Sequence, residues 1–317
     1  MRSSATPPTP WKSEPGRPCL IPRAFPWTTE ILRSSCAASL NSRTPMPRRL
    51  PAMQRALLTI AAVAGAVFLN TAAQASGTLA DAYAIIATKK FVDLTHSFSP
   101  ETPVWKGFGQ ATMAAAANPK THQPYTIEQA GFRTTFYAMV GQYGTHVDPP
   151  AHFDPKGTTM DRLPLKEMIL RLVVFDETPL LAKDPNHALS VADIRAWETI
   201  HGQVPQGAFA ALRTDLSKDW AQNPERFKRY PFPAWSLEAI QFLFEQRGVT
   251  AIGHESLDTD IKDNFASEAW LLQHNHWQIE AMAHLDQVPA TGAVIVVTWP
   301  KVENGLGFPA RAFAILP

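Results

Sequence analysis

One stretch decides how the rest of this sequence is interpreted: Gly141-Gln142-Tyr143-Gly144-Thr145-His146-Val147-Asp148-Pro149-Pro150-Ala151-His152-Phe153. Its side chains that could bind a metal or transfer a proton stand at even spacings, at Gln142, His146, Asp148 and His152. In an extended chain such positions point to one side, but the two prolines end any regular strand before His152. A loop that offers nitrogen and oxygen donors beside a strand end is a common place for a catalytic metal. The alternative is a polar turn with two surface histidines.

Strands and helices are expected to alternate around this stretch. Segments rich in β-branched and apolar residues predict strands at 91–95, 134–140, 171–176, 209–215, 249–253, 293–298 and 311–316. Apolar residues at helical spacing predict helices at 79–90, 191–201, 237–247 and 268–275. Ser190 and Ser236 are expected to cap two of these helices. Because the connections are short and no internal repeat is present, we expect a single α/β domain.

The segment 53–75 has the three parts of a secretory signal. Arg55 gives it a basic start, an apolar run extends over residues 56–69, and an Ala-x-Ala sequence ends at Ala75. The apolar run is shorter than the ~20 residues that a membrane span needs. We therefore expect cleavage after Ala75, a periplasmic or secreted location, and no stable membrane insertion after cleavage. The alternative is an uncleaved membrane anchor.

The preceding residues, 1–52, differ in composition from the rest of the chain. They hold 10 of the 28 prolines and no histidine. Since a signal peptide begins at an N-terminus, we interpret them as an over-extended reading frame, with translation starting at Met53 or Met46. The alternative is a disordered leader. The functional domain is expected to span residues 76–317.

Removing the leader and the signal changes the charge balance. Residues 1–75 contain nine of the 29 basic and two of the 28 acidic residues, which leaves residues 76–317 with 20 basic and 26 acidic groups and a net charge near −6. An acidic domain has no electrostatic reason to bind nucleic acid. Both cysteines, Cys19 and Cys36, precede residue 76, so thiol catalysis and thiolate ligation are excluded from the mature domain. The sequence also has no Gly-x-Ser-x-Gly elbow, dinucleotide turn or P-loop.

Several short segments together resemble the cyclase family, which includes kynurenine formamidases and isatin hydrolases. They are Asp93-Leu94-Thr95-His96, Thr102-Pro103-Val104-Trp105-Lys106-Gly107, residues 144–153, Leu212-Arg213-Thr214-Asp215 and Leu285-Asp286-Gln287-Val288-Pro289. The resemblance covers residues 91–317. It implies a swivelling β/β/α fold, a homodimer or homotetramer, and metal-dependent opening of an amide, often in an aromatic substrate, with Zn²⁺ or Mn²⁺.

The resemblance also assigns roles to individual residues. His146 and Asp148 match metal ligands, and Glu280 matches the acidic ligand near the C-terminus. His152 matches the histidine that transfers protons. Trp105 matches an aromatic wall of the substrate site.

Two positions depart from the pattern of the family. Gln142 stands where the family usually has histidine, four residues before His146, and Glu268 stands where it has a metal-binding histidine, twelve residues before Glu280. Both residues are expected near the metal as oxygen ligands. Replacing imidazoles by oxygen donors makes the site harder, which favours Mn²⁺ over Zn²⁺.

The expected function is metal-dependent hydrolysis of the C–N bond of a small N-acyl or cyclic amide, arylformamidase-like. A divalent metal would activate water and polarise a carbonyl, and His152 would move the proton. His276 and His254 are further candidates for substrate contact, their alternatives being a surface histidine and part of an acidic surface loop. The competing functions are a lactonase, a cyclase or dehydratase, and a non-catalytic periplasmic binding protein with a degenerate metal site.

Overall fold

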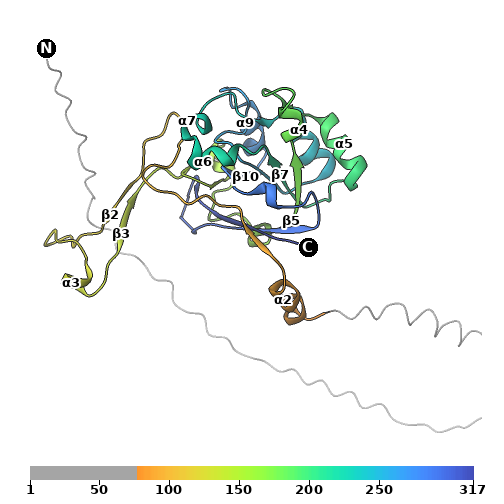
Figure 1. Ribbon diagram of the computed structural model, residues 1–317. Helices are drawn as coiled ribbons and strands as arrows, with labels where there is room; N and C mark the ends of the chain where they lie inside the picture. Colours follow the sequence, from red (N-terminus) through yellow and green to blue (C-terminus); the bar gives the residue numbers. More distant parts are fainter. Residues whose placement is uncertain (1–76) are drawn as a thin grey trace, which may run out of the picture. The chain divides into compact units, whose positions relative to one another are not determined.

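The computed structural model describes residues 77–317, so the expected signal at 53–75 and the leader lie outside the described residues. The described part is a mixed α/β domain built on a nine-stranded sheet, in the order β1-β13-β11-β5-β7-β9-β10-β4-β12 (Figure 1). The strands of this sheet are β1 (Phe91–Asp93), β4 (His146–Asp148), β5 (Ile169–Asp176), β7 (Phe209–Arg213), β9 (Ala251–His254), β10 (Trp277–Glu280), β11 (Ala293–Thr298), β12 (Phe308–Pro309) and β13 (Arg311–Ile315). The expectation of a single α/β domain is confirmed.

The helices are short apart from α5. They are α2 (Leu79–Ala87), α3 (Ile127–Ala130), α4 (Thr178–Leu181), α5 (Val191–His201), α6 (Asp219–Gln222), α7 (Pro224–Phe227), α8 (Leu237–Gln241) and α9 (Ala266–Gln273). Figure 1 shows α4, α5 and α9 on the same side of the central strands in this view. Two further pairs of strands stand outside the main sheet: β2 (Thr112–Ala115) with β3 (Thr135–Ala138), and β6 (Ala188–Leu189) with β8 (Ala234–Trp235).

The centre of the sheet is parallel and buried on both faces. Strands β5, β7, β9 and β10 pair in parallel, and the outer pairings are antiparallel. Neighbouring residues of β5 enter different core clusters, since Val174 packs with Trp277 and Ile279 whereas Val173 packs with Leu212 and the residues of α8. This two-sided burial explains why these strands appear in the sequence as continuous apolar runs.

Helix α5 begins and ends as the sequence predicts. The Ser190 side chain accepts from the backbone of Asp193, and the Asp193 carboxylate accepts in return from the backbone of Ser190. This capping box satisfies N–H groups that a helix start leaves without partners. Ile194 is the fully buried residue of the helix, and the Trp197 indole donates to the carbonyl oxygen of Val174 at 3.0 Å. The helix is thereby attached to the face of β5.

The expected helix at 237–247 is only partly an α-helix. Ser236 caps it as predicted, but α8 ends at Gln241 and a π-helical turn continues over Phe242–Gln246. Three consecutive residues, Phe242, Leu243 and Phe244, are buried there. Successive residues of an α-helix point in different directions, so the wider turn allows all three to face the core.

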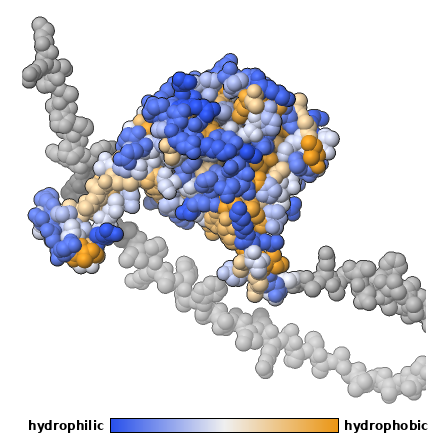
Figure 2. Space-filling view, viewed as in Figure 1, coloured by the Kyte–Doolittle hydropathy of each residue, from blue (hydrophilic) through white to orange (hydrophobic). Residues whose placement is uncertain are grey.

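Apolar side chains remain exposed on two projecting parts. Figure 2 shows apolar surface on α2 and on the β2–β3 hairpin with α3, while the body is mainly polar in this view. The exposed large residues of these parts are Leu79, Tyr83, Ile85, Ile86, Ile127, Phe132, Phe136 and Tyr137. Within residues 77–317, no helix combines the length and apolar character needed to cross a membrane.

The buried carboxyl group of Glu177 should make the stability of the fold depend on pH. Glu177 is fully buried beside α4, and neither side-chain oxygen has a hydrogen-bond partner among the described residues. Burial, with a smaller contribution from Asp193, raises the pKa of Glu177 from 4.5 to about 9. Between these two values the folded state holds a proton that the unfolded chain releases, so the free energy of unfolding falls as pH rises through this window, by up to ~1.4 kcal/mol per pH unit.

Glu177→Gln should therefore flatten the pH dependence of stability. We expect the melting temperature of the wild type to fall more than that of the variant between about pH 5 and pH 8. Thermal unfolding at a series of pH values measures the difference. Glu238→Gln, at an exposed position of α8, is the matched control and should behave as the wild type. Equal pH dependence in wild type and Glu177→Gln would contradict the assignment.

Candidate metal centre and substrate pocket

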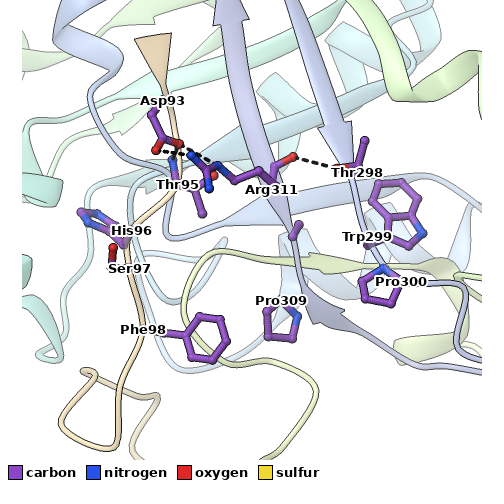
Figure 3. Close-up of a pocket in the computed structure, with 11 residues that line it drawn as sticks. Asp93, Thr95, His96, Ser97, Phe98, Thr298, Trp299, Pro300, Pro309 and Arg311 are labelled. Atoms are coloured by element: carbon purple, nitrogen blue, oxygen red, sulfur yellow. Dashed lines mark hydrogen bonds and ion pairs between the residues drawn. The ribbon is translucent and has the colours of Figure 1, made fainter. Parts of the chain in front are cut away.

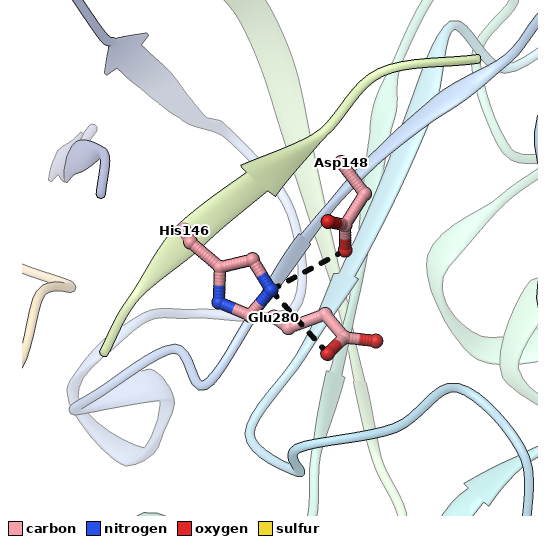
Figure 4. A group of neighbouring side chains, drawn as sticks. All are labelled: His146, Asp148 and Glu280. Atoms are coloured by element: carbon pink, nitrogen blue, oxygen red, sulfur yellow. Dashed lines mark ion pairs between the residues drawn. The ribbon is translucent and has the colours of Figure 1, made fainter. Parts of the chain in front are cut away.

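Four polar side chains meet on one face of the pairing between β4 and β10. These strands are antiparallel, with His146 opposite Glu280 and Asp148 opposite Gln278. Directly opposite residues of a sheet point to the same face, and residues two apart on one strand do so as well. The register therefore gathers donors from segments about 130 residues apart in the sequence, as Figure 4 shows for three of them.

His146 is oriented as a metal ligand. Its Nδ1 donates to the carbonyl oxygen of Gly144 at 2.8 Å, so Nε2 is the ring nitrogen left to bind an ion, which would replace its proton. Nε2 lies 3.5 Å from Asp148 Oδ2 and 3.6 Å from Glu280 Oε2, and it has no hydrogen-bond partner among the described residues. Donor atoms at ~2.1 Å from one ion in tetrahedral geometry are ~3.4 Å apart. The three donor atoms lie within 4.8 Å of one another and fit one divalent cation.

The charge of the cluster also favours a cation. Asp148, Glu268 and Glu280 are buried within it, and burial together with the neighbouring carboxylates raises the pKa of Glu268 and of Glu280 well above the ordinary value. Burial alone would lower the pKa of His146, but Asp148 and Glu280 outweigh burial and raise the pKa to about 9. Several buried carboxylates that repel one another are costly without a positive charge between them. A divalent ion supplies that charge.

Gln278 connects the carboxylates and was not predicted as a site residue. Its amide nitrogen lies 3.0 Å from Glu280 Oε1, 3.2 Å from Glu268 Oε1 and 3.3 Å from Asp148 Oδ2. Its amide oxygen accepts from the Thr259 hydroxyl at 2.7 Å. The signal was present in the sequence as Gln278-Ile279-Glu280, where alternation about an apolar residue places both polar side chains on the same face.

Gln142 approaches the cluster with its nitrogen rather than its oxygen. The amide nitrogen donates to Leu306 O at 2.7 Å and to Asp148 Oδ1 at 3.3 Å, and it lies 3.4 Å from His152 Nδ1. A Cβ atom at Gly307 would collide with this amide, so only glycine allows the approach. Gln142 was expected as an oxygen ligand, but the structure places it as a donor that orients Asp148.

A pocket of about 290 Å³ opens beside the cluster. Its lining combines a polar end with aromatic walls: Trp105, Phe108, Gln142, His146, His152, Phe153, Leu257, Asp258, Phe265 and Glu268. The ring of Phe265 lies 6.0 Å from that of Trp105 and 5.9 Å from that of Phe153. His152 is half-buried in the short turn η1 (Pro150–His152), because the two prolines end β4 as the sequence predicts. The arrangement suits a flat aromatic molecule with one polar edge.

Two histidines expected at the substrate do not line this pocket. His254 is fully buried at the end of β9, its Nε2 is 3.3 Å from Glu280 Oε1, and neither ring nitrogen has a hydrogen-bond partner among the described residues. Burial lowers the pKa of His254 to about 4, so the ring is neutral. His276 stacks on Phe244 at 4.0 Å because the turn between α9 and β10 packs it against the helices. His254 therefore contacts a carboxylate of the cluster from outside the pocket, and His276 packs against the edge of the hydrophobic core.

A larger surface hollow of about 590 Å³ lies elsewhere, and Figure 3 shows its lining. Its one basic side chain, Arg311, is paired with Asp93 at 2.7 Å, and His96 stacks on Trp220 at 4.2 Å. The hollow contains none of the clustered carboxylates. The smaller pocket therefore holds the candidate chemistry.

Comparison with known proteins identifies the family. The Cyclase family model matches residues 92–261, more than half of the chain, so the chain belongs to the cyclase family. It is 28% identical over 245 residues to isatin hydrolase of Roseibium aggregatum, which covers 71% of this chain and 91% of the relative.

Solved structures agree with this family. Isatin hydrolase A from Labrenzia aggregata, bound to benzyl benzoate, superposes with a TM-score of 0.67 at 26% identity and covers 76% of this chain and 99% of that chain. Isatin hydrolase A from Ralstonia solanacearum gives 0.66 at 26% identity, with 78% and 100% covered. The expected family and its swivelling β/β/α fold are confirmed.

Removing the link between the carboxylates should weaken metal binding. In Gln278→Leu, which keeps a side chain of similar size, Asp148, Glu268 and Glu280 lose a common donor, and we expect Mn²⁺ affinity to fall ~10–100-fold. Calorimetric titration of chelator-treated protein measures the change. Gln273→Leu, at the exposed end of α9, is the control and should bind Mn²⁺ as the wild type does. Unchanged affinity in Gln278→Leu would show that the amide does not support the ligands.

Proposed function

We propose that this chain is a metal-dependent hydrolase that opens the C–N bond of a small aromatic cyclic amide, and its similarity to proteins named isatin hydrolase supports this proposal. The observation that carries the proposal is the free Nε2 of His146 facing two buried carboxylates at the polar end of an aromatic pocket. His146, Asp148 and Glu280 would hold the metal. The metal, when bound, supplies a Lewis acid that activates water and polarises a carbonyl oxygen.

The donor set favours a hard cation. One imidazole and two carboxylates are the ligands, and Glu268 adds a further carboxylate at the edge of the cluster. No thiolate is present, since residues 77–317 contain no cysteine. Oxygen-rich sites suit Mn²⁺ better than Zn²⁺. We propose Mn²⁺ as the preferred metal and Zn²⁺ as the alternative.

We propose that His152 transfers the proton. It lines the same pocket as His146, and its Nδ1 lies 3.4 Å from the Gln142 amide nitrogen. In hydrolysis of a cyclic amide, a base takes a proton from water and an acid gives one to the departing nitrogen. An imidazole performs both transfers near neutral pH. We assign both to His152.

The pocket walls support an aromatic substrate. Trp105, Phe153 and Phe265 surround an apolar space of a size that holds a fused bicyclic ring. Aromatic faces around a flat ligand add ~0.5–1.5 kcal/mol per pair beyond the area buried. A bicyclic lactam such as isatin fits this description, and an N-formyl aromatic amide is the arylformamidase alternative.

Location and assembly are proposals from the sequence. The signal at 53–75 would export the domain to the periplasm or outside the cell. The exposed apolar residues of the β2–β3 hairpin are consistent with a homodimer or homotetramer, because an isolated two-stranded hairpin is marginally stable in water.

Two substitutions should separate proton transfer from metal binding. We expect His152→Ala to retain the metal and lose ~10²–10⁴-fold in kcat on isatin, whereas Asp148→Ala should lose both metal and activity. Metal analysis and ring-opening assays with added Mn²⁺ or Zn²⁺ measure these outcomes, with N-formylkynurenine as the second substrate. His274→Ala, at an exposed histidine, is the control.

The assignment of His152 as the base fails if His152→Ala is fully active. A purified domain that binds no metal and hydrolyses neither substrate would favour the binding-protein alternative.

A further inference from the structure

The pocket lining contains a carboxylate that the metal centre does not use. Two carboxylates other than the proposed ligands are in contact with this space, Glu268 and Asp258. Glu268 is committed to the cluster, because its Oε1 accepts from Gln278. Asp258 lies beside Leu257 in the pocket wall, is 2% exposed, and makes no hydrogen bond to a member of the cluster.

Asp258 is held rigidly by its neighbours. Its Oδ2 accepts from the Tyr230 hydroxyl, its Oδ1 accepts from the backbone N–H of Asp260 at 2.9 Å, and its carbonyl oxygen accepts from the Ser256 hydroxyl at 2.8 Å. A carboxylate has about four lone-pair positions, so about two remain free. A fixed carboxylate with free lone pairs in a pocket wall can accept a hydrogen bond from a ligand that offers a donor.

The Tyr230 hydroxyl leaves the free lone pairs of Asp258 available to a substrate. Its proton is given to Asp258, and the hydroxyl oxygen accepts from the Trp105 indole at 3.2 Å. Burial, together with Asp258, raises the pKa of Tyr230, so the phenol stays protonated and keeps donating to Asp258. The chain from Trp105 through Tyr230 to Asp258 thus fixes an aromatic wall and a carboxylate relative to each other.

No cation within the described residues competes for Asp258. Lys106 follows Trp105 but forms its ion pair with Asp263, and its ammonium lies 5.1 Å from the centre of the Tyr230 ring. None of the other lysine and arginine ion pairs of residues 77–317 includes Asp258. Burial raises the pKa of Asp258 to about 6, so at neutral pH the group is ionised and only accepts.

We propose that Asp258, positioned by Tyr230, accepts the ring N–H of the substrate and makes the enzyme select lactams with a free N–H over N-alkylated lactams and lactones. This inference rests on the proposed function. A bicyclic lactam presents one in-plane donor, its N–H, next to the carbonyl that is attacked. A lactone and an N-alkylated lactam have no donor at that place and would leave the buried carboxylate unpaired, which a site disfavours strongly.

The same contact orients the nitrogen for cleavage. An amide N–H lies in the plane of the ring. Once water has added to the carbonyl carbon and amide resonance is lost, the nitrogen lone pair stands roughly perpendicular to this plane and can take a proton, and the electron pair of the C–N bond passes to nitrogen when that bond breaks. With the N–H held by Asp258, the perpendicular direction is free for the proton from His152, which lines the same pocket. The carbonyl carbon gains the hydroxyl of water, the C–N bond breaks, and nitrogen ends with two protons, one original and one from His152.

The experiment compares isatin with N-methylisatin on four proteins: wild type, Asp258→Asn, Tyr230→Phe and Asp263→Asn. A hydrogen bond to a charged acceptor contributes ~10–100-fold in kcat/KM. We expect the wild type to prefer isatin, and Asp258→Asn to reduce the isatin/N-methylisatin ratio at least about tenfold, mainly by losing activity on isatin. Tyr230→Phe keeps the carboxylate but removes its anchor, so the ratio should fall less.

Asp263→Asn is the matched control, since Asp263 is an exposed carboxylate of the same loop that pairs with Lys106 outside the pocket lining. Its ratio should equal that of the wild type. Comparing ratios cancels the bulk of the methyl group, which acts on every variant. Metal content and melting temperature show whether each variant is folded, and Tyr230→Phe alone decides the matter if Asp258→Asn does not fold.

The possible failures are distinguishable. If the wild type hydrolyses both compounds and the ratio is unchanged in Asp258→Asn and Tyr230→Phe, Asp258 only braces its loop and the inference is wrong while the proposed function stands. If the metal-loaded wild type hydrolyses neither isatin nor N-methylisatin, the proposed function fails, and the inference fails with it.

Discussion

The antiparallel pairing of β4 with β10 is the interaction on which the site depends. It places His146 opposite Glu280 and Asp148 opposite Gln278, so that one face of two short strands holds three donors and the amide that links them. Because side chains alternate along a strand, a shift of one residue in this register would send all four to the other face. The parallel pairing of β10 with the buried β9 fixes the register from the other side. The metal chemistry is thereby positioned by backbone hydrogen bonds rather than by flexible loops.

Buried negative charge is the second constraint, and amide side chains partly offset it by donating hydrogen bonds to the carboxylates. Gln142 and Gln278 both donate to Asp148, at 3.3 Å each, and Gln278 also donates to two glutamates. Such bonds hold carboxylates in place without contributing charge of their own. The remaining charge must be met by a cation, and Nε2 of His146, which has no hydrogen-bond partner among residues 77–317, faces two of the carboxylates. An oxygen-rich centre fastened by amides follows from these contacts.

The sequence predicted well what depends on local pattern. Helix α5 begins after Ser190 and ends at His201 as its cap and spacing indicate, and the prolines end β4 before His152. The family motif located the donors but not their pairing. Strand β10 and Gln278 were not predicted, although the alternation in Gln278-Ile279-Glu280 is a local signal. The pairing of this strand with β4, a segment about 130 residues away, is a contact that no local period encodes. His254 was expected to contact the substrate because the sequence does not reveal that β9 packs in parallel beside β10. This packing buries the ring against Glu280, outside the pocket lining.

The metal cluster and the pocket are built from different kinds of structure, and this separation has a consequence for function. The proposed metal ligands lie on paired strands, whereas Trp105 and Asp258 in the pocket wall come from loops. Tyr230, from a third segment, joins these two residues by hydrogen bonds. Loops tolerate substitution better than buried strands do. Substrate preference can therefore change through the residues that surround Asp258 while the hydrolytic centre stays intact. In this chain, the group that we propose recognises the nitrogen does not belong to the sheet that carries the proposed metal ligands.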